Sequence, residues 1–355
     1  LATRLSSKIP DAQIGTALER FGRLQIRQGD LAESSNTTVE QRKALYFDAR
    51  RLLRELAFAN PLLTEIDNLL LIKRHDSVGV IHMCDQYYGC NAKPGGGLFV
   101  LEDPFTGHPK LKNLLGNSVV ESGRLKGQSL TGGTFLSPDI SFDGQTILFA
   151  YSEAKAYSKY QGKTAYEWTP ECSYHIFKCN ADGSGLTQLT DGPLDDFDPC
   201  FLPAGRIVFI SERRGGYLRC GRHCPFYTMF SMEPAGSDIV CISFHETHEW
   251  HPSVDNNGMI VYSRWDYVDR DTNIAHHLWT CYPDGRDPRS YHGNYPANNN
   301  RNARPWMEQS IRSIPGSNKY VAVTGAHHGQ AFGSLVMIDH RLEDDGACSQ
   351  ITRLT

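Results

Sequence analysis

One pattern occurs three times in this chain, and this repeat constrains the fold more than any other feature. Each copy begins with an X-Pro pair, continues as a short apolar strand, turns at Gly, and returns as a second strand with alternating apolar residues. The prolines are Pro138, Pro199 and Pro252, so the copies are 61 and 53 residues apart (199 − 138 and 252 − 199). A third and a fourth strand, separated by another Gly turn, close each copy. Four strands per unit at such a period predict a radial array of small sheets, a β-propeller.

Two less regular units flank the three clear copies. The segments LLLIKRH and GGGLFVLEDP indicate strands of a first unit, and a fifth unit begins near Trp306. Five blades are therefore countable in residues 61–355. The final segment, ITRLT, matches the LTQLT that closes the second unit, and closed propellers have about four to eight blades. We therefore expect an all-β propeller that is incomplete at its C-terminus, with about six to seven four-stranded blades when intact.

Residues 1–60 have a different pattern. The stretch from Thr37 to Glu40 has the form of a capping box, and the sequence after it has Leu and Phe at helical spacing. This predicts an N-terminal helical segment before the propeller. A net charge of −4 argues against nucleic acid as a partner, and no apolar run approaches the roughly 18 residues that a membrane span needs.

The strand connections differ in length between the two faces of the predicted propeller. The turns on one face are minimal and contain Gly, whereas the loops on the other face run over about 152–173, 212–227, 266–275 and 325–333. Long ordered loops in compact domains usually bind something. We therefore predict the site on the long-loop face.

Most histidines fall in connections on that face, in the segments HMCD, HETHEWH, AHH and AHHG. Imidazole, thiolate and carboxylate together are ligands of Zn²⁺, Mn²⁺ and Fe²⁺. A propeller brings one residue from each blade to its axis. The equivalent positions in the four later units are Ser137, Asp198, His251 and Glu308, which predicts a ring containing Asp198, His251 and Glu308, joined by His248 and one histidine of each adjacent pair. Of the adjacent His276 and His277, only one is expected to face the site, because neighbours on a strand point to opposite faces. The predicted metal ligands are His82, Cys84, Asp85, Asp198, His248, His251, His277 and His327, and the predicted catalytic residues are His248, Glu308 and His328.

Two further groups are candidates for binding substrate. Arg213, Arg219 and Arg222 share one loop and suit a carboxylate or sulfate, although a solvated loop closed by a Cys220–Cys224 link is an equal alternative. Trp265 and Tyr267 lie among acidic residues, as in sugar sites, or simply brace their own loop. No CxxCH is present, so the chain shows no signal for attachment of a c-type haem.

Several segments carry a resemblance to known families. The stretches NADGSGLTQLTDGP and DDFDPCFLPAGRIVF resemble the repeats of TolB-like propellers. Others resemble a family related to the propeller domain of the hydrazine synthase alpha subunit; they are HMCDQYYG, GGGLFVLEDP, FHETHEWHPS, RWDYVDRDTNIAHHLW and GAHHGQAFGS. The resemblance covers about residues 65–355 and implies a periplasmic or secreted propeller.

Three functions follow from these observations. The first is an enzyme, a metal-assisted lyase or hydrolase, that acts on a small polar or glycan-like substrate at a divalent metal ion. The second is a non-catalytic platform that docks a protein on the long-loop face. The third, implied by the resemblance alone, is a redox subunit partnered with haem.

Overall fold

The computed structural model describes residues 10–63, 65–77, 82–155, 168–220, 224–267, 276–292, 307–328, 333–342 and 348–355. The chain forms two compact units. One comprises Leu1–Leu70 and Val100–Lys112, and the other comprises Leu71–Phe99 and Asn113–Thr355.

The first unit contains a pair of antiparallel helices, α2 (Asp11–Glu33) and α3 (Val39–Phe58). Ion pairs join them, from Arg20 to Glu55 and, at 2.8 Å, from Arg27 to Asp48. The capping box begins one residue later than predicted: Thr38 accepts from the Gln41 N–H at 3.2 Å, and the Gln41 side chain accepts from the Thr38 N–H at 2.8 Å. A short 3₁₀ helix, η1 (Pro61–Leu63), follows α3. No helix in the described part of the chain is long and apolar enough to cross a membrane.

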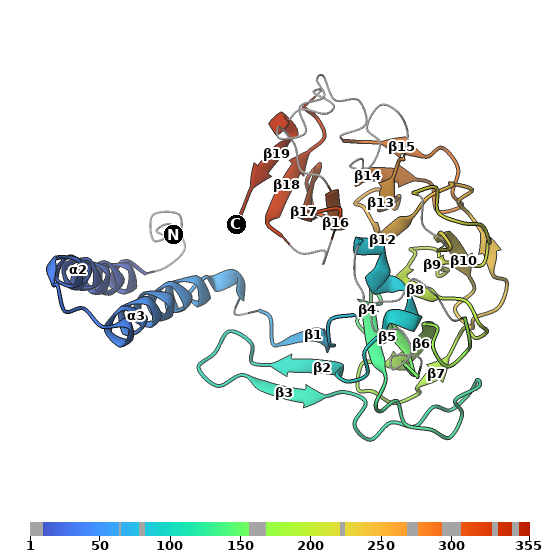
Figure 1. The fold of residues 1–355 in the computed structure, drawn as a ribbon, viewed down its shortest axis with the longest axis horizontal. Helices are drawn as coiled ribbons and strands as arrows, with labels where there is room; N and C mark the ends of the chain where they lie inside the picture. Colours follow the sequence, from blue (N-terminus) through green and yellow to red (C-terminus); the bar gives the residue numbers. More distant parts are fainter. Residues whose placement is uncertain are drawn as a thin grey trace. The chain divides into compact units, whose positions relative to one another are not determined.

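The β-strands form the predicted units, in chain order. A three-stranded sheet comes first, followed by four antiparallel sheets in which each strand pairs with the next (Figure 1). A single parallel bridge, between His276 and Met307, joins the last two sheets.

The first sheet contains β1 (Asn68–Lys73), β2 (Gly97–Glu102) and β3 (Lys110–Asn113). The others contain β4 (Thr134–Ile140), β5 (Thr146–Ser152), β6 (His175–Asn180) and β7 (Thr187–Gln188); β8 (Asp196–Phe201), β9 (Ile207–Ser211), β10 (Thr228–Met232) and β11 (Val240–Cys241); β12 (Glu249–Val254), β13 (Ile260–Trp265), β14 (His276–Cys281) and β15 (Arg289–Ser290); and β16 (Met307–Ser313), β17 (Lys319–Gly325), β18 (Leu335–Asp339) and β19 (Ile351–Arg353), the last preceded by η4 (Cys348–Gln350).

The first strands of the four sheets contact one another in sequence, β4 with β8, β8 with β12 and β12 with β16. This places them innermost, as a propeller requires. Each of these strands has a β-bulge, and each bulge has a residue in the left-handed region, with φ near +50°. The four residues are Ser137, Asp198, His251 and Ser310. The prediction of equivalent positions is confirmed for the first three, but the fourth is Ser310, two residues beyond the predicted Glu308.

The segment 82–92 is a buried plug among the innermost strands. It forms two short 3₁₀ helices, η2 (Met83–Tyr87) and η3 (Gly89–Asn91), and all of its residues are buried. The ring of Tyr87 stacks on Phe197 of β8 at 5.2 Å. As predicted, this segment connects two strands, β1 and β2, and the structure also packs it into the hydrophobic core.

Candidate functional site

Two clusters of ionisable side chains lie on opposite faces of strand β14. The strand begins with His276 and His277, whose side chains alternate across it. His276 lies with His82 and His327, and His277 lies with His292 and Glu308. The prediction that only one histidine of this pair faces a site stays a prediction, because each of the two faces meets a group of side chains that could hold a metal ion. All six residues are buried.

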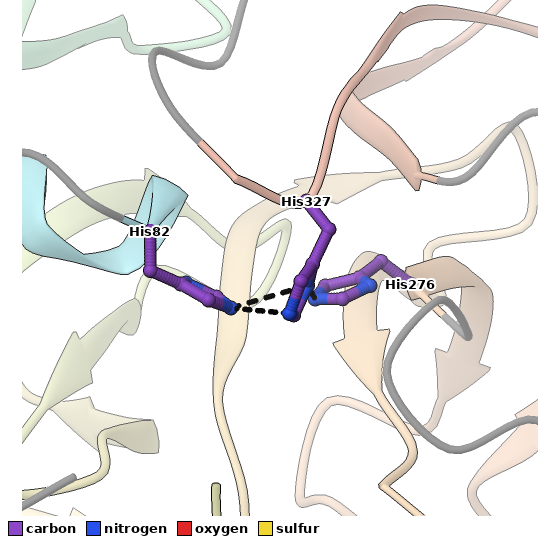
Figure 2. Close-up of side chains that lie close together, drawn as sticks. All are labelled: His82, His276 and His327. Carbon is purple, nitrogen blue, oxygen red and sulfur yellow. Dashed lines mark hydrogen bonds between the residues drawn. The ribbon is translucent and has the colours of Figure 1, made fainter.

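In the three-histidine cluster, each imidazole approaches the next (Figure 2). His82 Nε2 lies 3.1 Å and 3.0 Å from the two ring nitrogens of His327, and His327 Nδ1 lies 3.3 Å from His276 Nε2. The Met83 N–H donates to the His327 carbonyl at 3.2 Å, which fixes the plug against the loop after β17. The indole of Trp265 covers the cluster, with its ring 4.9 Å from those of both His82 and His276.

Hydrogen bonding assigns the protons in this cluster. The Cys84 N–H donates to His82 Nδ1 at 3.1 Å. A neutral imidazole has one proton, so His82 carries it on Nε2 and donates it toward His327. Burial, with His328 adding to the effect, lowers the pKa of His327 to about 3, so that ring is neutral at pH 7. A metal ion bound to His82 Nε2 would have to displace the proton that His82 donates toward His327.

In the second cluster, a carboxylate faces two imidazoles. Glu308 Oε1 lies 2.8 Å from His292 Nε2 and 3.6 Å from His277 Nδ1. Burial alone would raise the pKa of Glu308, but His292 and His277 outweigh burial and lower it to about 2. The carboxyl group is therefore ionised and buried, which requires a compensating positive charge.

The proton assignment on His292 differs from that on His82. Gln350 Nε2 donates to the Leu342 carbonyl at 2.6 Å, so Gln350 Oε1 faces His292 and accepts from its Nδ1–H. A neutral His292 ring would direct the Nε2 lone pair at a carboxylate oxygen only 2.8 Å away, whereas a doubly protonated ring would donate a hydrogen bond to that oxygen. Neither ring nitrogen of His277 has a hydrogen-bond partner in the part of the chain that the structure describes. A second proton on His292 or a bound cation would remove the repulsion, and two imidazoles with one carboxylate suit Zn²⁺, Fe²⁺ or Mn²⁺.

Sequence reasoning found His277 and Glu308 but missed His292. His292 follows β15, two residues beyond the strand, and meets Glu308 only because the chain folds back. Its presence in the same repeat as the His276–His277 pair is the one signal that could have suggested it. The Nδ1–H···Oε1 bond from His292 to Gln350 is the kind of outer contact that orients histidine ligands.

The other predicted metal ligands lie outside both clusters. Asp198 and His251 meet at the inner bulges, where the His251 N–H donates to Asp198 Oδ2 at 2.9 Å. His248 stacks on Tyr227, with ring centroids 3.9 Å apart. The structure uses Asp85 as a helix cap, since its carboxylate accepts from the His82 N–H at 2.9 Å. Cys84 is buried in the plug.

The predicted catalytic and substrate-binding residues are dispersed. His328 is exposed beside the three-histidine cluster, 5.9 Å from the His82 ring. Arg213 pairs with the buried Asp196 at 2.5 Å, and Arg219 pairs with Glu246, so both charges are engaged within the protein. Arg222 lies outside the described residues. Trp265 is fully buried over the histidines, and Tyr267 meets its ring edge-on at 5.4 Å.

Comparison with known proteins supports the fold. No family model matches the chain, and no curated protein matches it. Among solved structures, hydrazine synthase from Kuenenia stuttgartiensis aligns with a TM-score of 0.55 at 15% identity, over 82% of this chain and 39% of that chain. TolB from Acinetobacter baumannii aligns with a TM-score of 0.47 at 9% identity, over 90% of this chain and 60% of that one.

These similarities define the class of protein. The chain is a β-propeller with an N-terminal helical segment. Its propeller resembles that of hydrazine synthase, and it spans less than half of the hydrazine synthase chain. At such low identity the similarity establishes the fold alone.

Proposed function

We propose that this propeller binds one divalent transition metal at Glu308, His277 and His292 and acts on a small polar or glycan-like substrate there. The observation that carries the proposal is a buried carboxylate that faces two imidazoles, with Glu308 Oε1 2.8 Å from His292 Nε2 and 3.6 Å from His277 Nδ1. A cation bound by these groups would supply the positive charge that the buried carboxylate requires.

The metal would supply Lewis-acid chemistry. Three protein ligands leave at least one coordination position for water or substrate in a four-coordinate site. A metal ion in such a site polarises a substrate oxygen or lowers the pKa of bound water. The resemblance to TolB-like propellers supports a periplasmic or secreted location as part of the same proposal.

Metal content tests the proposal and separates the two clusters. Protein purified without chelator or nickel resin is expected to contain close to one equivalent of zinc, manganese or iron by plasma mass spectrometry. Glu308→Gln should remove that metal, because the neutral amide neither balances the cation's charge nor binds it comparably. His327→Gln, at the three-histidine cluster, is the matched control and should retain it.

Circular dichroism would confirm that both variants fold. The proposal is overturned if Glu308→Gln keeps its metal. It is equally overturned if folded wild-type protein remains metal-free after zinc, manganese and iron are each offered.

The burial of the proposed metal ligands favours a second function, a platform that docks another protein. Glu308, His277 and His292 are 0%, 2% and 1% exposed, and closed sites are typical of structural metals. Cobalt(II)-substituted protein distinguishes the two functions. A change in its visible absorption on adding azide would show an open position and support the enzyme, whereas an unchanged spectrum would favour the platform. A haem-partnered redox role would instead appear as haem absorption in the intact protein.

A further inference from the structure

A cavity of about 330 Å³ lies among the inner bulges and shares no residue with either histidine cluster. Its wall includes four residues whose backbone lies in the left-handed region, one from each of four consecutive sheets. They are Ser137, Asp198, His251 and Ser310. Such backbone conformations are strained in residues other than Gly, and strain of this kind concentrates at functional sites. Four strained residues from four sheets thus surround one cavity.

The negative charge in this cavity is already engaged by the protein. Asp198 accepts from the Ser137 hydroxyl and, at 2.9 Å, from the His251 N–H. The Ser310 N–H in turn donates to His251 Nδ1 at 3.3 Å. These bonds link the four bulges in a chain and hold the carboxylate against the wall.

The positively charged side chains that line the cavity are Arg74 and Arg312, and they have fewer hydrogen-bond partners in the described protein than their guanidinium groups can accommodate. Arg74 Nη2 donates to Gln86 Oε1 at 2.9 Å, while Arg74 Nη1 is buried without a hydrogen-bond partner among the described residues. Arg312 donates to the Ile311 carbonyl at 2.9 Å. Within the described parts of the chain, neither guanidinium forms an ion pair with a carboxylate. Among the residues that line the cavity, two arginines accompany one aspartate, so the lining carries a surplus of positive charge; Asp139, which does not line the cavity, also attracts Arg312.

Tyr87 adds a directed hydrogen-bond donor. His251 Nδ1 accepts from Ser310, so the neutral ring carries its proton on Nε2, which lies 2.7 Å from the Tyr87 oxygen. Burial lowers the pKa of His251 and raises that of Tyr87 well above its usual range, so the imidazole is neutral and the phenol keeps its proton. Tyr87 accepts from His251, and its own O–H is left to donate elsewhere.

We propose that this cavity binds a small molecule that carries a carboxylate and a second polar group. Arg74 and Arg312 would hold the carboxylate, since guanidinium groups bind carboxylates through paired hydrogen bonds. Tyr87 would donate to the second group. A cavity volume of about 330 Å³ lies within the range of sites that bind small molecules.

Isothermal titration calorimetry with succinate, malonate, inorganic phosphate and glycerol tests this assignment. At least one dicarboxylate should bind saturably, more tightly than phosphate, while glycerol should not bind. Arg74→Gln and Arg312→Gln should each weaken binding of that dicarboxylate about tenfold or more, because each removes a charge-assisted contact. Tyr87→Phe should weaken it less. Arg341→Gln is the matched control and should have no effect, because that exposed arginine pairs with Asp339 away from the cavity.

Thermal unfolding would confirm that each variant folds, and Arg312 is exposed enough for its replacement to leave the core intact. The same titration on Glu308→Gln separates this site from the metal site, because carboxylate binding should persist when the metal is lost. The assignment is wrong if neither dicarboxylate binds, if both arginine variants bind as tightly as the wild type, or if phosphate binds more tightly than either dicarboxylate.

Discussion

At the scale of single residues, the propeller buries several acids whose protonation depends on folding. Asp195 and Glu212 are both buried, and the Asp195 N–H donates to Glu212 Oε2 at 3.2 Å. Burial raises the pKa of Asp195 to about 8. Burial also raises the pKa of Glu212 well above its usual range, and Asp195 adds to that effect. The folded protein therefore holds protons that the unfolded chain releases near pH 4.

This arrangement predicts that Asp195 and Glu212 lower the stability of the fold as the pH rises. At these two sites the folded state binds more protons than the unfolded state between about pH 4 and 8, so each such proton lowers the free energy of unfolding by about 1.4 kcal/mol per pH unit. Buried neutral histidines such as His327 contribute the opposite slope below about pH 6.5, so the effect of the two acids is read from the difference between variants. Glu212→Gln should make the decrease shallower, because the amide does not titrate. Urea unfolding at pH 5.5, 6.5 and 7.5 would measure it. The exposed Glu121→Gln is the control, and an identical slope in Glu212→Gln and the wild type would contradict the prediction.

At the scale of elements, the buried plug depends on a glycine that no other residue can replace. A Cβ at Gly89 would lie 2.1 Å from the Cys172 carbonyl oxygen and 2.7 Å from Asp195 Oδ1. The carbonyl belongs to the backbone, so a flexible side chain cannot relieve the clash. The Gly89 N–H also donates to Asp195 Oδ1 at 3.0 Å, which fixes η3 in place.

We therefore expect Gly89→Ala to lower the free energy of unfolding by at least about 2 kcal/mol. Urea unfolding compared with Gly107→Ala would show the difference, because a Cβ at Gly107 meets no atom within 4 Å. Equal stability of the two variants would mean that the plug does not pack against the loop containing Cys172 as described.

At the scale of the propeller unit, the proposed metal would join two sheets. Glu308 belongs to β16, and His277 belongs to β14 of the preceding sheet. The orienting Gln350 comes from η4, before the last strand of the fifth sheet. A ligand that binds only the folded state stabilises it, by about 2.7 kcal/mol when its free concentration is a hundred times its Kd.

Thermal unfolding should therefore depend on metal. Removing the metal with a chelator is expected to lower the Tm of the wild type, and returning it should restore the Tm. Glu308→Gln should show the same Tm with and without metal. A wild-type Tm that does not respond to chelation, in protein shown to contain metal, would place the ion elsewhere.

Much of the fold was predictable because its signals are local. Gly turns, alternating apolar strands and X-Pro openings repeat within a few residues, and they identify the units, their order and three of the four inner bulge residues. The fourth, Ser310, was misplaced by two residues because it is followed by Ile311 and lacks the proline that marks the others.

Residue types and repeat spacing alone thus determined a propeller with histidine-rich connections and the equivalent inner positions of Asp198 and His251. Only the tertiary structure decided which side chains meet. His82 reaches His327 across 245 residues, and Glu308 meets His292 through a turn of the chain after β15. Such contacts depend on how sheets pack around the plug. Proton positions depend on them too, because a hydrogen bond to Cys84 or Gln350 decides which imidazole nitrogen keeps a lone pair.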